Sequence, residues 1–130
     1  MNRIHSTVAL LIFGAIPVIA SAIAPMSAVA GDSEPVGCYQ DRQWQISIDY
    51  QNNTYRYQGQ KIGSAQSIQL SGATVSRVGS RQIYSWNNGG TRYQVAWKSQ
   101  DPDFIRVRVI TPNGKEVLNR LLAAAQMCDY

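Results

Sequence analysis

Residues that favour tight turns recur about every ten residues along this chain, and this spacing constrains its fold more than any other feature. The turn signals lie at residues 51–53, 59–63, 71–72, 79–80, 87–90, 101–103 and 112–114. Each interval between two signals is long enough for one short strand. The spacing therefore predicts a mainly β domain, a small antiparallel sandwich or barrel of about six or seven strands.

The run WQISIDY at 44–50 shows the strand pattern clearly. Apolar and polar residues alternate in it, so that Trp44, Ile46 and Ile48 share one face of a strand. The run TYRYQ at 54–58 follows after an Asn-Asn turn. This order predicts a hairpin between the two runs.

The run YSWNNGGTRYQVAW at 84–97 carries two tryptophans and two tyrosines around a turn. These rings are either a platform for a ligand or part of the core. A two-residue turn at 88–89 would pair Tyr84 with Tyr93 and Trp86 with Thr91. Since side chains alternate along a strand, Tyr84, Trp86 and Tyr93 would then share one face.

The next apolar run, FIRVRVI at 104–110, decides between the two interpretations. Aligned antiparallel to 91–97, it places Trp97 opposite Ile105, Val95 opposite Val107 and Tyr93 opposite Val109. A face shared with three β-branched aliphatic residues belongs in a core rather than in water. We therefore expect Trp86 and Trp97 to point inward.

The same alignment places a basic stripe on the outward face. Arg92, Arg106 and Arg108 project from adjacent strands, and Lys98 lies beside them where the following loop starts. Such a patch can hold an anionic polymer, lipid headgroups or an acidic partner protein through forked guanidinium hydrogen bonds. The alternative is a solvated sheet face whose arginines block edge pairing.

The segment KEVLNRLLAAAQM at 115–127 supports two readings. Val117, Leu118, Leu121 and Leu122 fall on one face at helical spacing, which predicts a C-terminal helix packed over one end of the sheet. The preceding Asn-Gly instead favours a hairpin, which would make residues 115–122 a further strand. We expect the helix, because a strand would send Val117 and Leu118 to opposite faces.

The first thirty residues have the form of a signal peptide. An apolar stretch at 8–24 is followed by Ala28-Val29-Ala30, the small-residue pattern that a signal peptidase reads. Cleavage before Gly31 would leave a single exported domain at 31–130, in the periplasm or secreted, without a transmembrane segment. The alternative is an uncleaved membrane anchor.

Two cysteines, Cys38 and Cys128, stand near the two ends of the exported part. An even pair in a small exported domain predicts a disulfide that closes the fold. The alternative, a free thiol nucleophile, lacks a neighbouring histidine to activate it.

Several chemistries are missing from the exported part. The chain's one histidine, His5, lies in the leader, so the catalytic arrangements and zinc sites that need histidine are excluded. Asp101 and Asp103 could hold Ca²⁺ or hydrolyse a glycosidic bond, but Asp-Pro-Asp is also a good turn. We expect the turn, no metal, no cofactor and no enzymatic activity.

The net charge of the exported part is modest. Of the 12 Lys and Arg residues, Arg3 lies in the leader, while all 8 Asp and Glu residues lie beyond it, so the exported part carries +3. It has no long basic run, and an exported protein leaves the compartment that contains the cell's nucleic acids. We expect no nucleic-acid partner.

The run YSWNNGGTRYQVAWKSQDPDFIRVRVITPNGKEVLNRLL at 84–122 resembles small exported proteins of cyanobacteria with no assigned function. The resemblance implies an exported single domain and supplies no site residues. We expect a non-catalytic envelope protein that binds a partner protein or anionic polymer through its basic face. The alternatives are an inhibitor or accessory subunit acting through the loop 99–103, and a small hydrolase built on Asp101 and Asp103.

Overall fold

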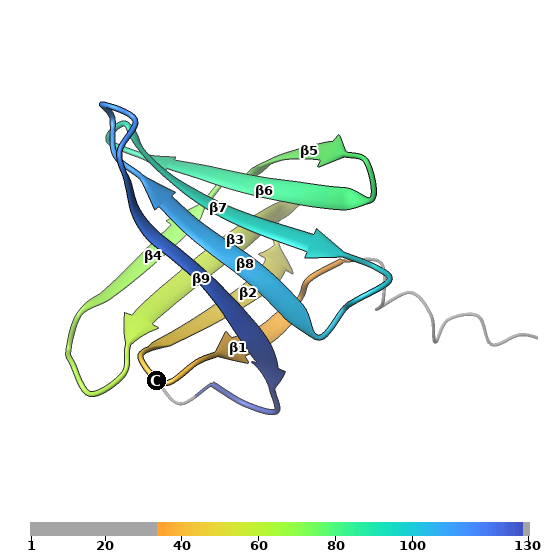
Figure 1. Cartoon of the computed structure of the whole chain (residues 1–130), viewed down its shortest axis with the longest axis horizontal. Coiled ribbons are helices and arrows are strands. Elements are labelled where there is room, and N and C mark those ends of the chain that lie inside the picture. The colour runs from red at the N-terminus through yellow and green to blue at the C-terminus, as the bar shows by residue number, and fades with distance from the viewer. Residues whose placement is uncertain (1–33, 129–130) are drawn as a thin grey trace, which may run out of the picture.

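A computed structural model describes residues 34–128, and this part of the chain is built from strands without a helix (Figure 1). The expected leader at 1–30 lies outside the described residues. The strands are β1 Gly37–Gln40, β2 Trp44–Gln51, β3 Thr54–Lys61, β4 Ser67–Ser71, β5 Thr74–Val78, β6 Arg81–Asn88, β7 Thr91–Lys98, β8 Phe104–Ile110 and β9 Glu116–Ala125.

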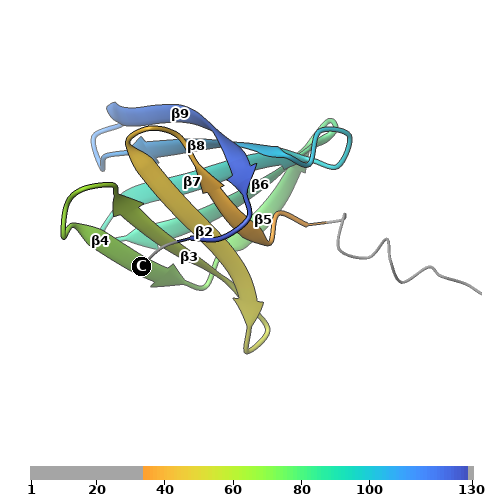
Figure 2. The ribbon, with the colours of Figure 1, turned by 90° about the horizontal axis from the view of Figure 1, so that it is seen from below.

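The strands form one antiparallel sheet in the order β4-β3-β2-β1-β9-β8-β7-β6-β5. The sheet curls into a half-barrel, with β6 to β9 facing β2 to β4 across the core and the strands of the two halves crossing (Figure 1, Figure 2). The edge strands β4 and β5 follow each other through residues 72–73. The expected antiparallel β fold is confirmed.

The expected number of six or seven strands was too low, since residues 34–128 form nine. Of the three additional strands, β9 was expected as a helix, and β1 and β5, which are four and five residues long, were not identified as alternating runs. Every residue of β5 is exposed, so this strand carries no buried face for alternation to reveal.

The interior is filled by the residues that the alternation placed inward. Trp86 and Trp97 are 1% and 2% exposed, and Val95 and Val107 are fully buried. Each of these indoles donates its N–H to a main-chain carbonyl, Trp86 to Tyr55 at 3.0 Å and Trp97 to Pro102 at 3.2 Å. The two tryptophans are therefore core residues, as predicted.

The hairpin between β6 and β7 turns one residue later than expected. The turn is Gly89-Gly90, both with positive φ, so Trp86 pairs with Tyr93 instead of Thr91. Both central residues of a primed hairpin turn need positive φ, which Gly89 and Gly90 adopt without steric cost, although Asn88-Gly89 would also suit such a turn. The faces stay as predicted, since this shift moves each cross-strand partner by two residues.

The expected C-terminal helix was wrong, since residues 116–125 form strand β9. A turn at Thr111–Lys115, with Gly114 at a φ of 88°, returns the chain alongside β8. A bulge leaves Val117 without an opposite residue in β8, so that Leu118 still faces inward beside Val109. Pairing with β8 and burial of Leu122 outweigh the helical propensity of the segment.

The predicted disulfide is present. It joins Cys38 in β1 to Cys128 beyond β9, across 90 residues of sequence. β1 pairs with β9 on one side and β2 on the other, so the disulfide lies where the two halves of the sheet are joined.

Reducing this disulfide should lower the free energy of unfolding by about 4–5 kcal/mol, because the reduced unfolded chain regains the entropy of a 90-residue loop. Urea unfolding with and without a thiol reductant measures the difference. The double variant Cys38→Ser/Cys128→Ser should match the reduced protein and show no response to reductant. Equal stability of oxidised and reduced protein would contradict the expected role.

Candidate functional site

The predicted basic residues lie on the outward face of β7 and β8. Gln94 pairs with Arg108 and Ala96 with Arg106, as the alignment predicted, while Arg92 pairs with Ile110. Since Val95 and Val107 are buried on the other side of the same strands, these arginines point away from the core.

The four predicted cations are not equivalent. Arg108 donates two hydrogen bonds to the carboxylate of Glu116 in β9, at 2.8 and 2.5 Å. Arg106 donates to Asn119 at 2.8 Å, and Asn119 in turn donates to Glu116 at 2.6 Å. The hydrogen bonds from Arg108 and then Asn119 hold the pKa of Glu116 below its ordinary value. The charge of Arg108 is therefore balanced within the fold.

Two of the predicted cations, together with Arg81, gather around a hollow of about 200 Å³ on the same face, which we call the basic dish. Arg81 in β6 lies directly opposite Lys98 in β7, and Arg106 joins them from β8. The side chains of Arg81 and Lys98 make no ion pair or hydrogen bond within residues 34–128. The dish is lined by Arg81, Ala96, Trp97, Lys98, Asp101, Phe104, Ile105, Arg106 and Leu121.

Sequence reasoning missed Arg81, although a signal was present. Arg81 has the opposite parity to Trp86, which was expected to point inward, and outward residues of β6 lie beside outward residues of β7. Of the four predicted cations, Lys98 and Arg106 line the dish, together with Arg81. Arg92 lies further along β7, opposite Asn87, and does not line the dish.

The loop between β7 and β8 contains the two aspartates considered as a carboxylate pair. Main-chain bonds tie it down: Asp101 N–H donates to the Lys98 carbonyl at 3.1 Å, and the Asp103 carbonyl accepts from Ala124 N–H at 2.7 Å. Both aspartates are exposed. Over residues 34–128 there is no group of three or more His, Cys, Asp or Glu side chains placed to hold a metal ion.

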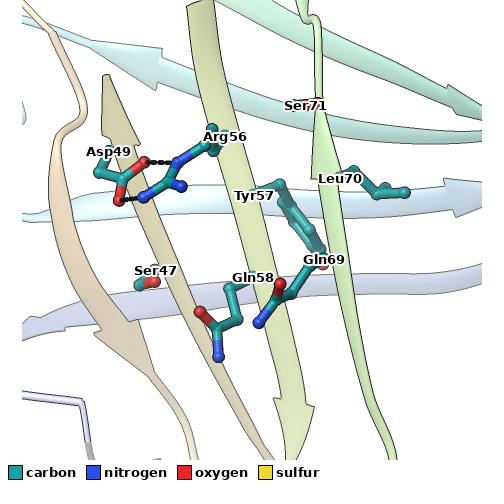
Figure 3. Close-up of a pocket in the computed structure, with 8 residues that line it drawn as sticks. All are labelled: Ser47, Asp49, Arg56, Tyr57, Gln58, Gln69, Leu70 and Ser71. Atoms are coloured by element: carbon teal, nitrogen blue, oxygen red, sulfur yellow. Dashed lines mark hydrogen bonds and ion pairs between the residues drawn. The ribbon is translucent and has the colours of Figure 1, made fainter. Parts of the chain in front are cut away.

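A polar hollow of about 420 Å³ lies on the other half of the sheet, on the outward face of β2, β3 and β4 (Figure 3). Arg56 donates to both carboxylate oxygens of Asp49, at 2.7 and 2.6 Å, and this hydrogen bonding lowers the pKa of Asp49. Around the pair lie Ser47, Gln58, Gln69 and Ser71. The hollow offers amides and hydroxyls but no unbalanced charge.

A third charged contact fastens the β1–β2 loop to β9. Asp41 accepts hydrogen bonds from the N–H groups of Gln43 and Trp44, both at 2.7 Å, and from the Arg120 guanidinium at 3.1 Å. Arg120 also donates to the Gln43 side chain. Burial acts to raise the pKa of Asp41, but these hydrogen bonds outweigh it and hold the pKa below its ordinary value of 3.8.

Comparisons with known proteins give no relative for this chain: no family model, no curated protein and no solved structure matches it. Within residues 34–128, no helix is long and apolar enough to cross a membrane.

Asp41 should make stability depend on acid pH. A carboxylate with a depressed folded-state pKa adds stability above its unfolded value of 3.8, and this contribution is lost as pH falls through the folded pKa. Asp41→Asn should therefore lower the urea midpoint at pH 7 and converge with the parent protein near pH 2.

Asp101→Asn is the matched control, because the exposed Asp101 side chain makes no ion pair or hydrogen bond among the described residues. It should change the urea midpoint little at either pH. A difference between Asp41→Asn and the parent protein that is as large at pH 2 as at pH 7 would refute the role given to the carboxylate.

Proposed function

We propose that this protein is an exported, non-catalytic binding protein that holds an anionic partner of the cell envelope against the basic dish. The observation that carries the proposal is the gathering of Arg81, Lys98 and Arg106 around one hollow. Two of these side chains have no partner within the described part of the chain.

The chemistry of the dish favours anions. Guanidinium groups donate paired hydrogen bonds to carboxylate, sulfate or phosphate, and the ammonium of Lys98 adds a compact positive charge. Asp101 lines the same hollow and is outnumbered by the three cations. An anionic group seated there would meet a positive potential that solvent and counter-ions otherwise screen.

The rim of the dish adds apolar contact. Phe104 and Leu121 are 39% and 52% exposed and line the dish beside the cations. Apolar groups at the rim exclude water from a bound partner, which strengthens the ionic hydrogen bonds inside. This combination suits a partner whose anionic groups are attached to a carbon framework, such as an acidic envelope polymer.

The export part of the proposal rests on two features. The leader pattern at 1–30 predicts secretion, and the Cys38–Cys128 disulfide fits an oxidising compartment. The non-catalytic part rests on the absence of histidine beyond His5 and on the main-chain role of the loop at 99–103.

The triple variant Arg81→Gln/Lys98→Gln/Arg106→Gln tests the proposal. Loss of three charge-assisted contacts should weaken binding to sulfated dextran, a soluble model of an acidic polymer, about tenfold or more. Salt elution from a sulfated-dextran column and calorimetry measure the change. The melting temperature should stay nearly constant, because the three side chains lie on the outward face.

A matched control removes the same charge elsewhere. Arg42→Gln/Lys61→Gln/Lys115→Gln also lowers the net charge by three, and none of these side chains lines the dish. This control should bind sulfated dextran within about twofold of the parent protein. Equal losses in both triple variants would mean that net charge, and not the dish, governs binding, and would overturn the proposal.

A further inference from the structure

An apolar opening leads into the interior between the two halves of the sheet. β9 pairs with β1 only through residues 123–125, so its first half has no strand on that side (Figure 1). Here the structure contains a cavity of about 280 Å³. It is lined by Trp44, Tyr57, Gly59, Gln66, Ser67, Ile68, Tyr93, Val109, Val117 and Leu118.

Two local features of the backbone shape this cavity. At Gly59, a Cβ atom would lie 2.9 Å from the Tyr57 ring and 3.2 Å from Ile46, so only glycine leaves the ring its present position. At the β-bulge in β9, the adjacent residues Val117 and Leu118 both line the cavity. The shape of the cavity therefore depends on the backbone as well as on the side-chain rotamers.

The lining determines what the cavity can accept. Three aromatic residues, Trp44, Tyr57 and Tyr93, share the wall with aliphatic side chains, and no charged side chain from residues 34–128 lines it. A charged ligand group would lose its hydration there without an opposite charge in return. The ligand body is therefore neutral and mainly apolar.

Two aromatic polar groups in the wall have no hydrogen-bond partner within residues 34–128. Trp86 and Trp97 donate their indole N–H groups to carbonyls, but Trp44 donates its indole N–H to no described residue. The hydroxyl of Tyr93 likewise makes no hydrogen bond within residues 34–128. Since partly buried indole and phenol groups usually find a partner, these two favour a ligand with a hydrogen-bond acceptor.

We propose that this cavity binds a neutral, mainly apolar small molecule that carries one carbonyl or hydroxyl oxygen. The cavity volume lies near the lower end of the range for small-molecule sites, about 300–1,000 Å³. It is too small for a folded element of a partner protein. The site shares no lining residue with the basic dish, so it is independent of the function proposed above.

Titration with prodan, a neutral naphthyl ketone whose fluorescence shifts to the blue away from water, tests the site. The parent protein should give a saturable blue shift with one site per chain. Octanol should displace the probe and octanoate should not, because the cavity wall has no cation to balance a carboxylate. Absence of saturable binding, or equal competition by octanoate, would overturn the proposal.

Two substitutions test whether prodan binds in this cavity. Leu118→Trp fills it, and Val117→Asp adds a charge at a position that is 53% exposed and therefore tolerant of substitution. Both should raise the Kd for prodan at least tenfold. Val78→Asp is the matched control, on β5 and 65% exposed, and should leave the Kd unchanged. If Leu118→Trp fails to fold, Val117→Asp alone decides, and an unchanged Kd in that variant refutes the site.

Discussion

The inward packing of the β6–β7 hairpin is the interaction on which the rest of this structure depends. Trp86 and Trp97 are almost fully buried, and each N–H is bound by a carbonyl from outside the hairpin, in β3 and in the β7–β8 loop. The bond from Trp86 to Tyr55 crosses the core and connects the two halves of the curled sheet. Burial of two indoles with satisfied N–H groups fixes which face of β6 and β7 meets solvent.

That choice of face determines the surface chemistry. Because Tyr93, Val95 and Trp97 point inward, the intervening residues of β7 point outward with those of β8, and Arg92, Arg106 and Arg108 lie on that face. Glu116 balances Arg108, whereas Arg81 and Lys98 in the dish form no ion pair within residues 34–128. The apolar cavity also depends on this packing. It lies beside the first half of β9, where β1 no longer pairs with β9 and the inward side chains are left partly uncovered.

Residue parity explains how much of this could be read from the sequence. Alternation assigned Trp86, Trp97 and Val107 to the core correctly, because parity survives a shift of the turn by one residue. The exact location of the turn could not be read from the sequence, since Asn88-Gly89 and Gly89-Gly90 both suit a tight hairpin. The structure shows positive φ at Gly89 and Gly90. The strand β9 was missed because burial against β8 outweighed the helical pattern of its sequence. Arg81 was missed because only the exact register of β6 and β7 places it opposite Lys98.

Hydrogen exchange of the three indole N–H groups, followed by NMR on the oxidised protein without ligand, is the sharpest test of the inward packing of Trp86 and Trp97. Trp86 and Trp97 should exchange slowly, because their N–H groups are buried and bound to carbonyls, whereas Trp44, which has no acceptor within residues 34–128, should exchange fast. Exchange of all three indoles at the rate of a solvent-exposed tryptophan would contradict this packing, because the rings would then lie outside the core.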